Sequence, residues 1–192
     1  MQLRLIQPED AKQIHYKYFN NASFRQLYRP YDKSTSLEST KLVIENNCQI
    51  IAEGNVSYLE YGFFDYNNNL IGLMTLDAID FLSKKAEFLF GLFSPELDIR
   101  PRVGEAVLLA LIQVFNRLGF HKLCASVYSY NPRAIKSIAD IGFKAEGVLR
   151  QHVFIQNKGY VDLHVFGLLL TDVKECRAIK LYQKRCLGYI AF

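Results

Sequence analysis

The first half of the chain alternates short apolar runs with polar stretches. Residues 3–6 form an apolar-rich run that predicts a strand, and Pro8-Glu9-Asp10 then favours a helix start because acids stabilise the first helical turn. From residue 11 to about 48 the pattern is helical with polar interruptions, which predicts two or three short helices. We then expect three strands of an antiparallel meander, at residues 57–65, 70–79 and 85–93.

The clearest local signature is the segment NPRAIKSIADIGF, residues 131–143. Asn131 is a favoured N-cap, Pro132 suits the first helical position, and Gly142 suits the left-handed position that follows the last turn. Five apolar residues between them recur at helical spacing: Ala134, Ile135, Ile138, Ala139 and Ile141. The segment therefore predicts a helix over residues 132–141.

Further elements surround this helix. Before it, residues 103–118 are apolar almost all round, which predicts a buried helix, and residues 123–128 predict a strand. After it, residues 144–155 and 160–170 flank a polar, glycine-containing turn and predict a hairpin. The basic, moderately amphipathic end of the chain predicts one more helix packed on the same domain.

Composition limits the class of protein. The chain has 192 residues, of which 50% are hydrophobic and 22% charged, so it can form a single core and is not of the disordered class. Together with the order of elements, this predicts one α+β (mixed α/β) domain over residues 1–170, followed by a basic segment over residues 171–192. The net charge of +4 favours anionic ligands only slightly.

The four cysteines and four histidines are widely scattered, and no two of them form a close metal-ligand pair. We therefore expect reduced thiols and no metal site. The first ten residues lack the apolar core of a secretory signal, and no run reaches the roughly 20 apolar residues of a membrane span. These features predict a soluble, cytoplasmic protein with no membrane partner.

A basic, proline-containing loop precedes the apolar helix, in the sequence SPELDIRPRVGEA of residues 94–106. Free N–H groups and the positive end of the helix dipole make such a place an anion site, and Arg100 and Arg102 add charge. The alternative is a solvated connection with two surface arginines. The loop matches neither a Walker sequence nor a dinucleotide fingerprint.

The succession of strand, loop, apolar helix, strand and NPRAIKSIADIGF helix resembles the GNAT family of acyl-CoA-dependent N-acetyltransferases. Residues 131–147 look like that family's N-x-x-A-I…GF-x-x-EG signature, and the resemblance extends to about Leu170. Residues 149–162 are similar to the branch that acetylates ribosomal-protein N-termini, spermidine and amino sugars. The resemblance implies a mostly antiparallel central sheet of six to seven strands flanked by helices, with acetyl-CoA as the cosubstrate.

The resemblance also implies where acetyl-CoA binds. Backbone groups near Leu92 and Phe93 would hold the acyl and pantetheine arm, and a Q/R-x-x-G-x-G/A motif would bind the pyrophosphate through its amides. In this chain Pro101 occupies the Q/R place and removes a donor, whereas Arg100 and Arg102 add charge-assisted bonds to phosphate. The cofactor-binding residues implied are Leu92, Phe93, Arg100, Arg102, Val103, Gly104, Glu105, Asn131 and Arg133.

Direct acetyl transfer needs a base for the amine, donors for the oxyanion and an acid for the thiolate. The resemblance makes Glu87 the candidate base, acting directly or through water; the alternative is a solvent-facing charge on a strand. The positions where many relatives carry an acidic Tyr or a Ser hold Ile138 and Ala134. Nearby hydroxyl groups belong to Ser129, Tyr130 and Ser137, and Ser129 is our second catalytic candidate.

We therefore expect an N-acetyltransferase that moves an acetyl group from acetyl-CoA directly to a primary amine. An amino sugar, a polyamine and a protein N-terminus all remain open as acceptors, and so does a homodimer. One alternative is a catalytically silent member that binds CoA or a protein partner. Another, which we do not favour, is a nucleic-acid-associated module that uses the basic end of the chain: Lys174, Arg177, Lys180, Lys184 and Arg185.

Overall fold

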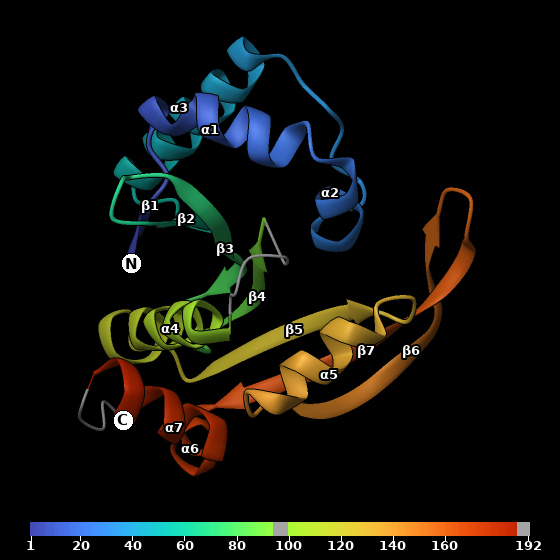
Figure 1. Ribbon diagram of the computed structural model, residues 1–192. Coiled ribbons are helices and arrows are strands. Elements are labelled where there is room, and N and C mark those ends of the chain that lie inside the picture. The colour runs from blue at the N-terminus through green and yellow to red at the C-terminus, as the bar shows by residue number, and fades with distance from the viewer. Residues whose placement is uncertain (94–99, 188–192) are drawn as a thin grey trace. The chain divides into compact units, whose positions relative to one another are not determined.

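The computed structural model describes residues 1–93 and 100–187. Within them the strands are β1 (Gln2–Leu5), β2 (Leu59–Phe64), β3 (Leu70–Asp80), β4 (Lys85–Leu92), β5 (Lys122–Tyr128), β6 (Lys144–Ile155) and β7 (Gly159–Leu169). They follow the order β1-β2-β3-β4-β5-β7-β6 in one sheet (Figure 1). The expected α+β fold with a sheet of six to seven strands is therefore confirmed.

The chain forms two compact units. Unit 1 comprises Met1–Ile79 and Leu89–Ala106, and unit 2 comprises Asp80–Phe88 and Val107–Phe192. Strand β4 contributes its second half to unit 1 and its first half to unit 2. Each unit has its own buried apolar residues, so the two are described separately.

Unit 1 contains the start of the meander. β1 pairs antiparallel with β2, and β2 pairs antiparallel with β3, with Gln2 opposite Phe64 and Leu59 opposite Leu76. The turn between β2 and β3 is closed by the carboxylate of Asp65, which accepts hydrogen bonds from the N–H groups of Asn67 and Asn69 at 2.9 Å each. The predicted strands and their antiparallel pairing are confirmed here.

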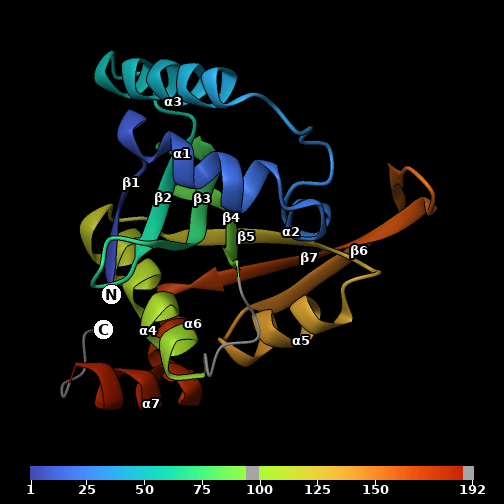
Figure 2. The same ribbon diagram turned by 45° about the horizontal axis from the view of Figure 1, so that its top comes forward.

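The helices between β1 and β2 lie on one face of β1, β2 and β3 (Figure 2). They are η1 (Pro8–Asp10), α1 (Ala11–Ile14), η2 (His15–Phe19), α2 (Ala22–Tyr28) and α3 (Leu37–Ala52). α3 is longer than expected because Ser36 caps it, accepting a hydrogen bond from the N–H of Ser39 at 3.1 Å, and apolar residues recur up to its end. The core beneath these helices includes Ile14, Ile44, Phe64, Leu70 and Leu73.

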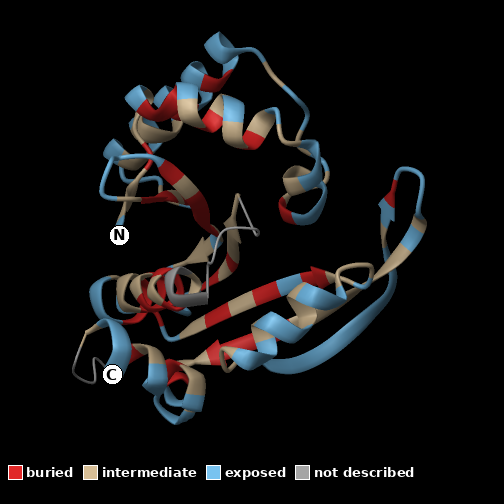
Figure 3. Cartoon of the chain, viewed as in Figure 1, coloured by how far each residue is buried: buried red, intermediate tan, exposed pale blue. Residues whose placement is uncertain are grey.

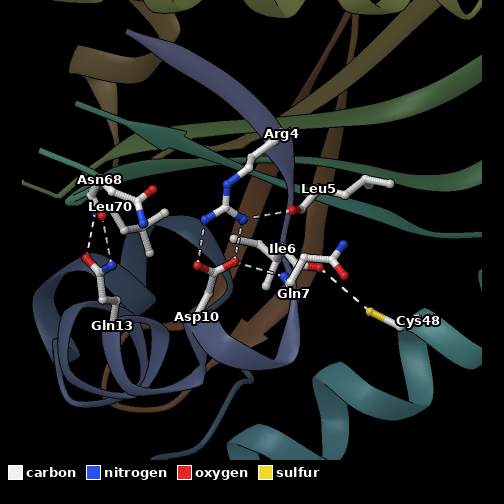
Figure 4. A network of polar contacts seen from close by, with 9 residues as sticks. All are labelled: Arg4, Leu5, Ile6, Gln7, Asp10, Gln13, Cys48, Asn68 and Leu70. Atoms are coloured by element: carbon white, nitrogen blue, oxygen red, sulfur yellow. Dashed lines mark hydrogen bonds and ion pairs between the residues drawn. The ribbon is translucent and has the colours of Figure 1, made fainter. Parts of the chain in front are cut away.

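A polar network fixes the N-terminal strand to the first helices (Figure 4). Arg4 binds the carboxylate of Asp10 through two hydrogen bonds of 2.6 and 2.8 Å, and its guanidinium lies 3.8 Å from the centre of the Phe64 ring. Asp10 also accepts a hydrogen bond from the N–H of Gln7 at 2.9 Å. This network explains why the helix starts where Pro8-Glu9-Asp10 predicts it.

In unit 2 the first residues of β4 pair parallel with β5, with Glu87 opposite Cys124. β5 pairs antiparallel with β7, and β7 with β6, which confirms the predicted C-terminal hairpin. Buried residues alternate with less buried ones along β5, whereas β6 is exposed along nearly its whole length (Figure 3).

The helix with the clearest start and stop signals in the sequence is α5 (Pro132–Asp140). The side chain of Asn131 accepts a hydrogen bond from the N–H of Ala134 at 3.1 Å, and Gly142 has a φ of 101°. Both capping predictions are therefore confirmed, and the helix ends one residue earlier than expected. Phe143 then turns inward and stacks on Phe88, with ring centres 6.0 Å apart.

The apolar helix begins earlier than its pattern predicts. It comprises α4 (Arg100–Leu111) and the π-helical turn η3 (Ile112–Arg117), so residues 100–102 belong to a first turn rather than to a loop. Proline is tolerated at this point because the first N–H groups of a helix have no intrahelical acceptor. The rest of the predicted loop, residues 94–99, lies outside the described residues.

The C-terminal segment is helical, but it forms two short helices where the sequence predicts one. It forms α6 (Leu170–Glu175), at whose start Asp172 accepts a hydrogen bond from the N–H of Leu169, and α7 (Arg177–Cys186). Across residues 1–93 and 100–187, no helix is both long enough and apolar enough to cross a membrane.

Candidate active site

The end of β4 in unit 1 is built for close packing against α2. Gly91 has no side chain, and a Cβ atom at this position would lie 2.6 Å from Cζ of Phe24. The Phe24 ring is stacked on Tyr28 at 5.1 Å and lies 4.8 Å from the ring of Phe93. Aromatic rings of α2 therefore pack against the backbone at this end of β4.

The main-chain N–H groups of Leu92 and Phe93 point to opposite edges of the strand. The N–H of Phe93 donates to the carbonyl of Ile71 at 3.0 Å, so it is used within the sheet. Because successive N–H groups of a strand point to opposite edges, the N–H of Leu92 points away from β3. Of the two residues that the resemblance implies for the acyl arm, Phe93 therefore uses its main-chain donor within the sheet.

A polar cluster on β2 and β3 faces the helices of unit 1. The hydroxyl of Tyr28 lies 2.9 Å from the hydroxyl of Thr75, and the phenol of Tyr58 donates to the carboxyl group of Glu60 at 3.0 Å. Burial raises the pKa of Glu60 because it disfavours the charged carboxylate. Burial also raises the pKa of Tyr28 and Tyr58, so both phenols stay protonated and act as donors.

Two contacts hold the segment that follows α2 against this cluster. Arg29 pairs with Asp77 at 3.0 Å and lies over the ring of Tyr58, 5.0 Å from its centre. The phenol of Tyr18 donates a short hydrogen bond to Asp32. Asp32, Tyr58 and Glu60 thus come to one place from separate segments of unit 1.

Glu87, the predicted base, lies on β4 within unit 2. Its side chain is half-buried, and Glu87 is the partner of Cys124 in the pairing of β4 with β5. The pKa of the Cys124 thiol is raised, mainly because burial disfavours the thiolate and also because the Glu87 charge lies nearby. Lys122 is paired with Glu146 at 2.7 Å, a contact that raises the pKa of Lys122.

The residues predicted around the start of α5 have different surroundings. Ser129 is exposed, and its N–H donates to the carbonyl of Asp162 at 3.0 Å, which leaves its hydroxyl for other partners. The side-chain oxygen of Asn131 is used in capping α5. Arg133 is exposed in the first turn of that helix.

The predicted pyrophosphate residues lie at the start of α4. Arg100 and Arg102 belong to its first turn, Val103 is half-buried, and Gly104 is buried. A carboxylate oxygen of Glu105 lies 3.0 Å from the main-chain nitrogen of Met1. The phosphate-binding role of this turn stays a prediction.

The basic residues of the C-terminal segment are exposed on α6 and α7. Ile179 and Gln183 form the buried side of α7, whereas the cations lie on its other sides. This is the arrangement of an ordinary amphipathic surface helix.

The sequence patterns did not predict the polar cluster of unit 1. Glu60 interrupts an otherwise apolar strand, in the sequence YLEYGFF, and that interruption was the signal available. Tyr18 and Asp32 carry no such signal, because only the fold brings them beside β2.

Known proteins resemble this chain over most of its length. A family model described as "Acetyltransferase (GNAT) domain" matches residues 3–165. The chain is 26% identical over 161 residues to a spermidine N(1)-acetyltransferase of Vibrio cholerae, covering 81% of this chain and 86% of that protein. It is 25% identical over 163 residues to the spermidine N(1)-acetyltransferase of Escherichia coli K12, covering 82% and 80%.

Solved structures give the same result. A structure of spermidine N-acetyltransferase from Vibrio cholerae, in complex with CoA and spermine, superposes with a TM-score of 0.76 at 26% identity. The match covers 90% of this chain and 97% of that one.

Proposed function

Because the chain belongs to the GNAT family of acetyltransferases, we propose that it moves the acetyl group of acetyl-CoA directly to a primary amine of a polyamine. The observation that carries the choice of acceptor is the likeness, over most of both chains, to spermidine acetyltransferases of two bacteria. The structure in complex with CoA and spermine supports both the donor and the acceptor class.

The residues of this chain fit such a donor. The N–H of Leu92 points away from β3, where it can donate to a carbonyl of the acyl or pantetheine arm. The first turn of α4 offers N–H groups without intrahelical acceptors, together with the positive end of the helix dipole, to the pyrophosphate.

In the proposed reaction the neutral amine attacks the thioester carbonyl, the new C–N bond forms, and the C–S bond breaks. Glu87 takes the proton that the amine loses, directly or through water, and a main-chain N–H such as that of Leu92 stabilises the oxyanion. The leaving thiolate takes up a proton; Ser129, whose hydroxyl is exposed, is the candidate that supplies it.

A cytoplasmic location is part of this proposal. All four cysteines are free thiols, which suits a reducing compartment.

The test is an acetylation assay with the purified protein, acetyl-CoA and a panel of amines: spermidine, spermine, an amino sugar nucleotide and a peptide with a free N-terminus. We expect release of free CoA thiol and an acetylated product with the polyamines. Binding of acetyl-CoA without turnover on any amine would identify a silent member instead. No binding of acetyl-CoA at millimolar concentration would overturn the proposal.

A further inference from the structure

Two aromatic rings of α2 rest on the backbone of β4 at Gly91. A Cβ atom at this position would lie 2.6 Å from Cζ of Phe24 and 3.1 Å from Cδ2 of Tyr28. Phe24 and Tyr28 lie on the same side of α2 because they are one helical turn apart, and their stacked rings have centres 5.1 Å apart. The space that a side chain of residue 91 would occupy is therefore filled by rings of α2.

These rings lie beside the main-chain donor that the proposed function assigns to the thioester. The N–H of Leu92 belongs to the peptide group that directly follows the Cα atom of Gly91, and a carbonyl oxygen that accepts from it lies about 2.9 Å from the nitrogen. The acyl group attached to that carbonyl therefore comes close to the Phe24 ring. Gly91, Leu92 and Phe24 are each half-buried, so they keep surface that a ligand can cover.

The Phe24 ring is held on several sides. Besides Tyr28, it contacts the ring of Phe93, with ring centres 4.8 Å apart, and the ring of Tyr18, with ring centres 5.9 Å apart. Tyr18 and Tyr28 are buried members of the core of unit 1. A ligand that displaced the Phe24 ring would have to disturb these packed neighbours, which is costly in a close-packed interior.

A buried chain of polar contacts fixes Tyr28 in turn. Its hydroxyl lies 2.9 Å from the hydroxyl of Thr75 on β3, and it donates to the carbonyl of Leu89 on β4 at 3.5 Å. Thr75 is fully buried, and its hydroxyl donates to the carboxyl group of Glu60 at 3.5 Å. Such a network fixes one arrangement of side chains, because any other leaves a buried donor or acceptor unsatisfied.

We propose that Phe24 limits the size of the acyl group that the enzyme transfers, and that Tyr28, held by Thr75, positions the Phe24 ring. The inference rests on the proposed function, which places the thioester carbonyl at the N–H of Leu92. The methyl group of an acetyl thioester fits beside the ring, whereas a butyryl chain presses against it. Phe24 is thus a specificity-determining residue, and Tyr28 and Thr75 are positioning residues.

The test measures kcat/KM for acetyl-CoA and for butyryl-CoA, with whichever amine of the panel reacts fastest. Phe24→Leu should raise the butyryl-to-acetyl ratio by about tenfold or more, because leucine leaves space where the ring stood. Phe19→Leu is the matched control. It makes the same change at another half-buried phenylalanine packed on this core, and it should leave the ratio unchanged.

The positioning role is tested by Tyr28→Phe and Thr75→Val, which nearly keep the side-chain shapes but remove the contact between the two hydroxyls. Each should raise the butyryl-to-acetyl ratio by about threefold to tenfold, and their combination should add little because both remove the same contact. Thr75→Ser keeps the hydroxyl and should restore the wild-type ratio. A loss of stability alone lowers kcat/KM for both donors alike, so the ratio distinguishes positioning from a structural role. Circular dichroism checks that each variant folds.

Equal use of the two donors by the wild type, or an unchanged ratio in Phe24→Leu, would overturn the inference even where acetylation of spermidine upheld the proposed function. An unchanged ratio in both Tyr28→Phe and Thr75→Val would refute the positioning role.

If no amine is acetylated, the proposed function fails, and calorimetric titration with the two thioesters still tests the inference. The affinity for butyryl-CoA relative to acetyl-CoA should rise in Phe24→Leu but not in Phe19→Leu. Equal relative affinities in these two variants, or no binding of either thioester, would contradict the role of Phe24.

Discussion

Arg4 and Asp10 face each other through two hydrogen bonds of 2.6 and 2.8 Å, with only 3% of the Asp10 side chain exposed (Figure 4). Asp10→Ala would leave the guanidinium of Arg4 and the N–H of Gln7 without their acceptor. We expect the free energy of unfolding to fall by about 2–4 kcal/mol. Urea unfolding measures this change.

The control for that prediction is Glu45→Gln, which breaks an exposed pair with Lys41 on α3. Its expected cost is about 0.5 kcal/mol or less. Equal losses in the free energy of unfolding in both variants would show that burial does not strengthen the Arg4–Asp10 pair.

The raised pKa of Glu60 predicts a pH-dependent stability. The unfolded chain ionises this residue near its ordinary pKa of about 4.3, whereas the folded chain holds the proton to higher pH. Between these two pKa values the folded state binds more protons, so the contribution of Glu60 to stability falls as pH rises.

Glu60→Gln cannot ionise, so its stability relative to the wild type should increase between pH 4 and pH 8. Urea unfolding across this range measures the difference. A difference that stays constant with pH would mean that Glu60 titrates alike in both states.

Gly91→Ala should disturb the packing of aromatic rings at the end of β4, because the new Cβ would lie only 2.6 Å from the Phe24 ring. We expect a loss of about 1–3 kcal/mol in the free energy of unfolding, together with slower acetylation. Gly147→Ala is the control, since no atom lies within 4 Å of a Cβ at that position. Equal thermal midpoints for the two variants would refute the packing argument.

Glu87→Gln should retain acetyl-CoA binding but lower kcat by about 10²-fold or more, because it removes the proposed base while keeping the side-chain volume. Thiol release measures kcat, and native mass spectrometry measures donor binding. Cys124→Ser, in the position opposite Glu87, is the control and should keep most of the activity. An unchanged kcat in Glu87→Gln would remove this residue from the mechanism.

Asn131→Ala should cost about 1 kcal/mol, because the N–H of Ala134 loses its cap, whereas Asn131→Asp keeps an acceptor and should cost less. Thermal unfolding of the two variants side by side tests the capping role. A donor affinity that falls in Asn131→Ala but not in Asn131→Asp would in addition connect the cap to acetyl-CoA binding.

Elements that depend on nearby residues could be predicted from the amino-acid sequence. Asn131 and Gly142 determine the ends of α5 because capping and positive φ depend on residues only a few positions apart. The meander follows from apolar runs and turn residues in the same way, and the GNAT likeness follows from the order of these elements.

Contacts between side chains that are distant in the sequence could not be predicted in this way. Asp32 and Glu60 line one cavity although 28 positions separate them in the sequence, and Phe24 reaches the end of β4 because Gly91 leaves room for its ring. Such contacts depend on how helices pack on the sheet, and packing depends on the shapes of many side chains at once. The sequence therefore indicated the reaction, whereas the cavity lined by Asp32 and Glu60 emerged only from the packed chain.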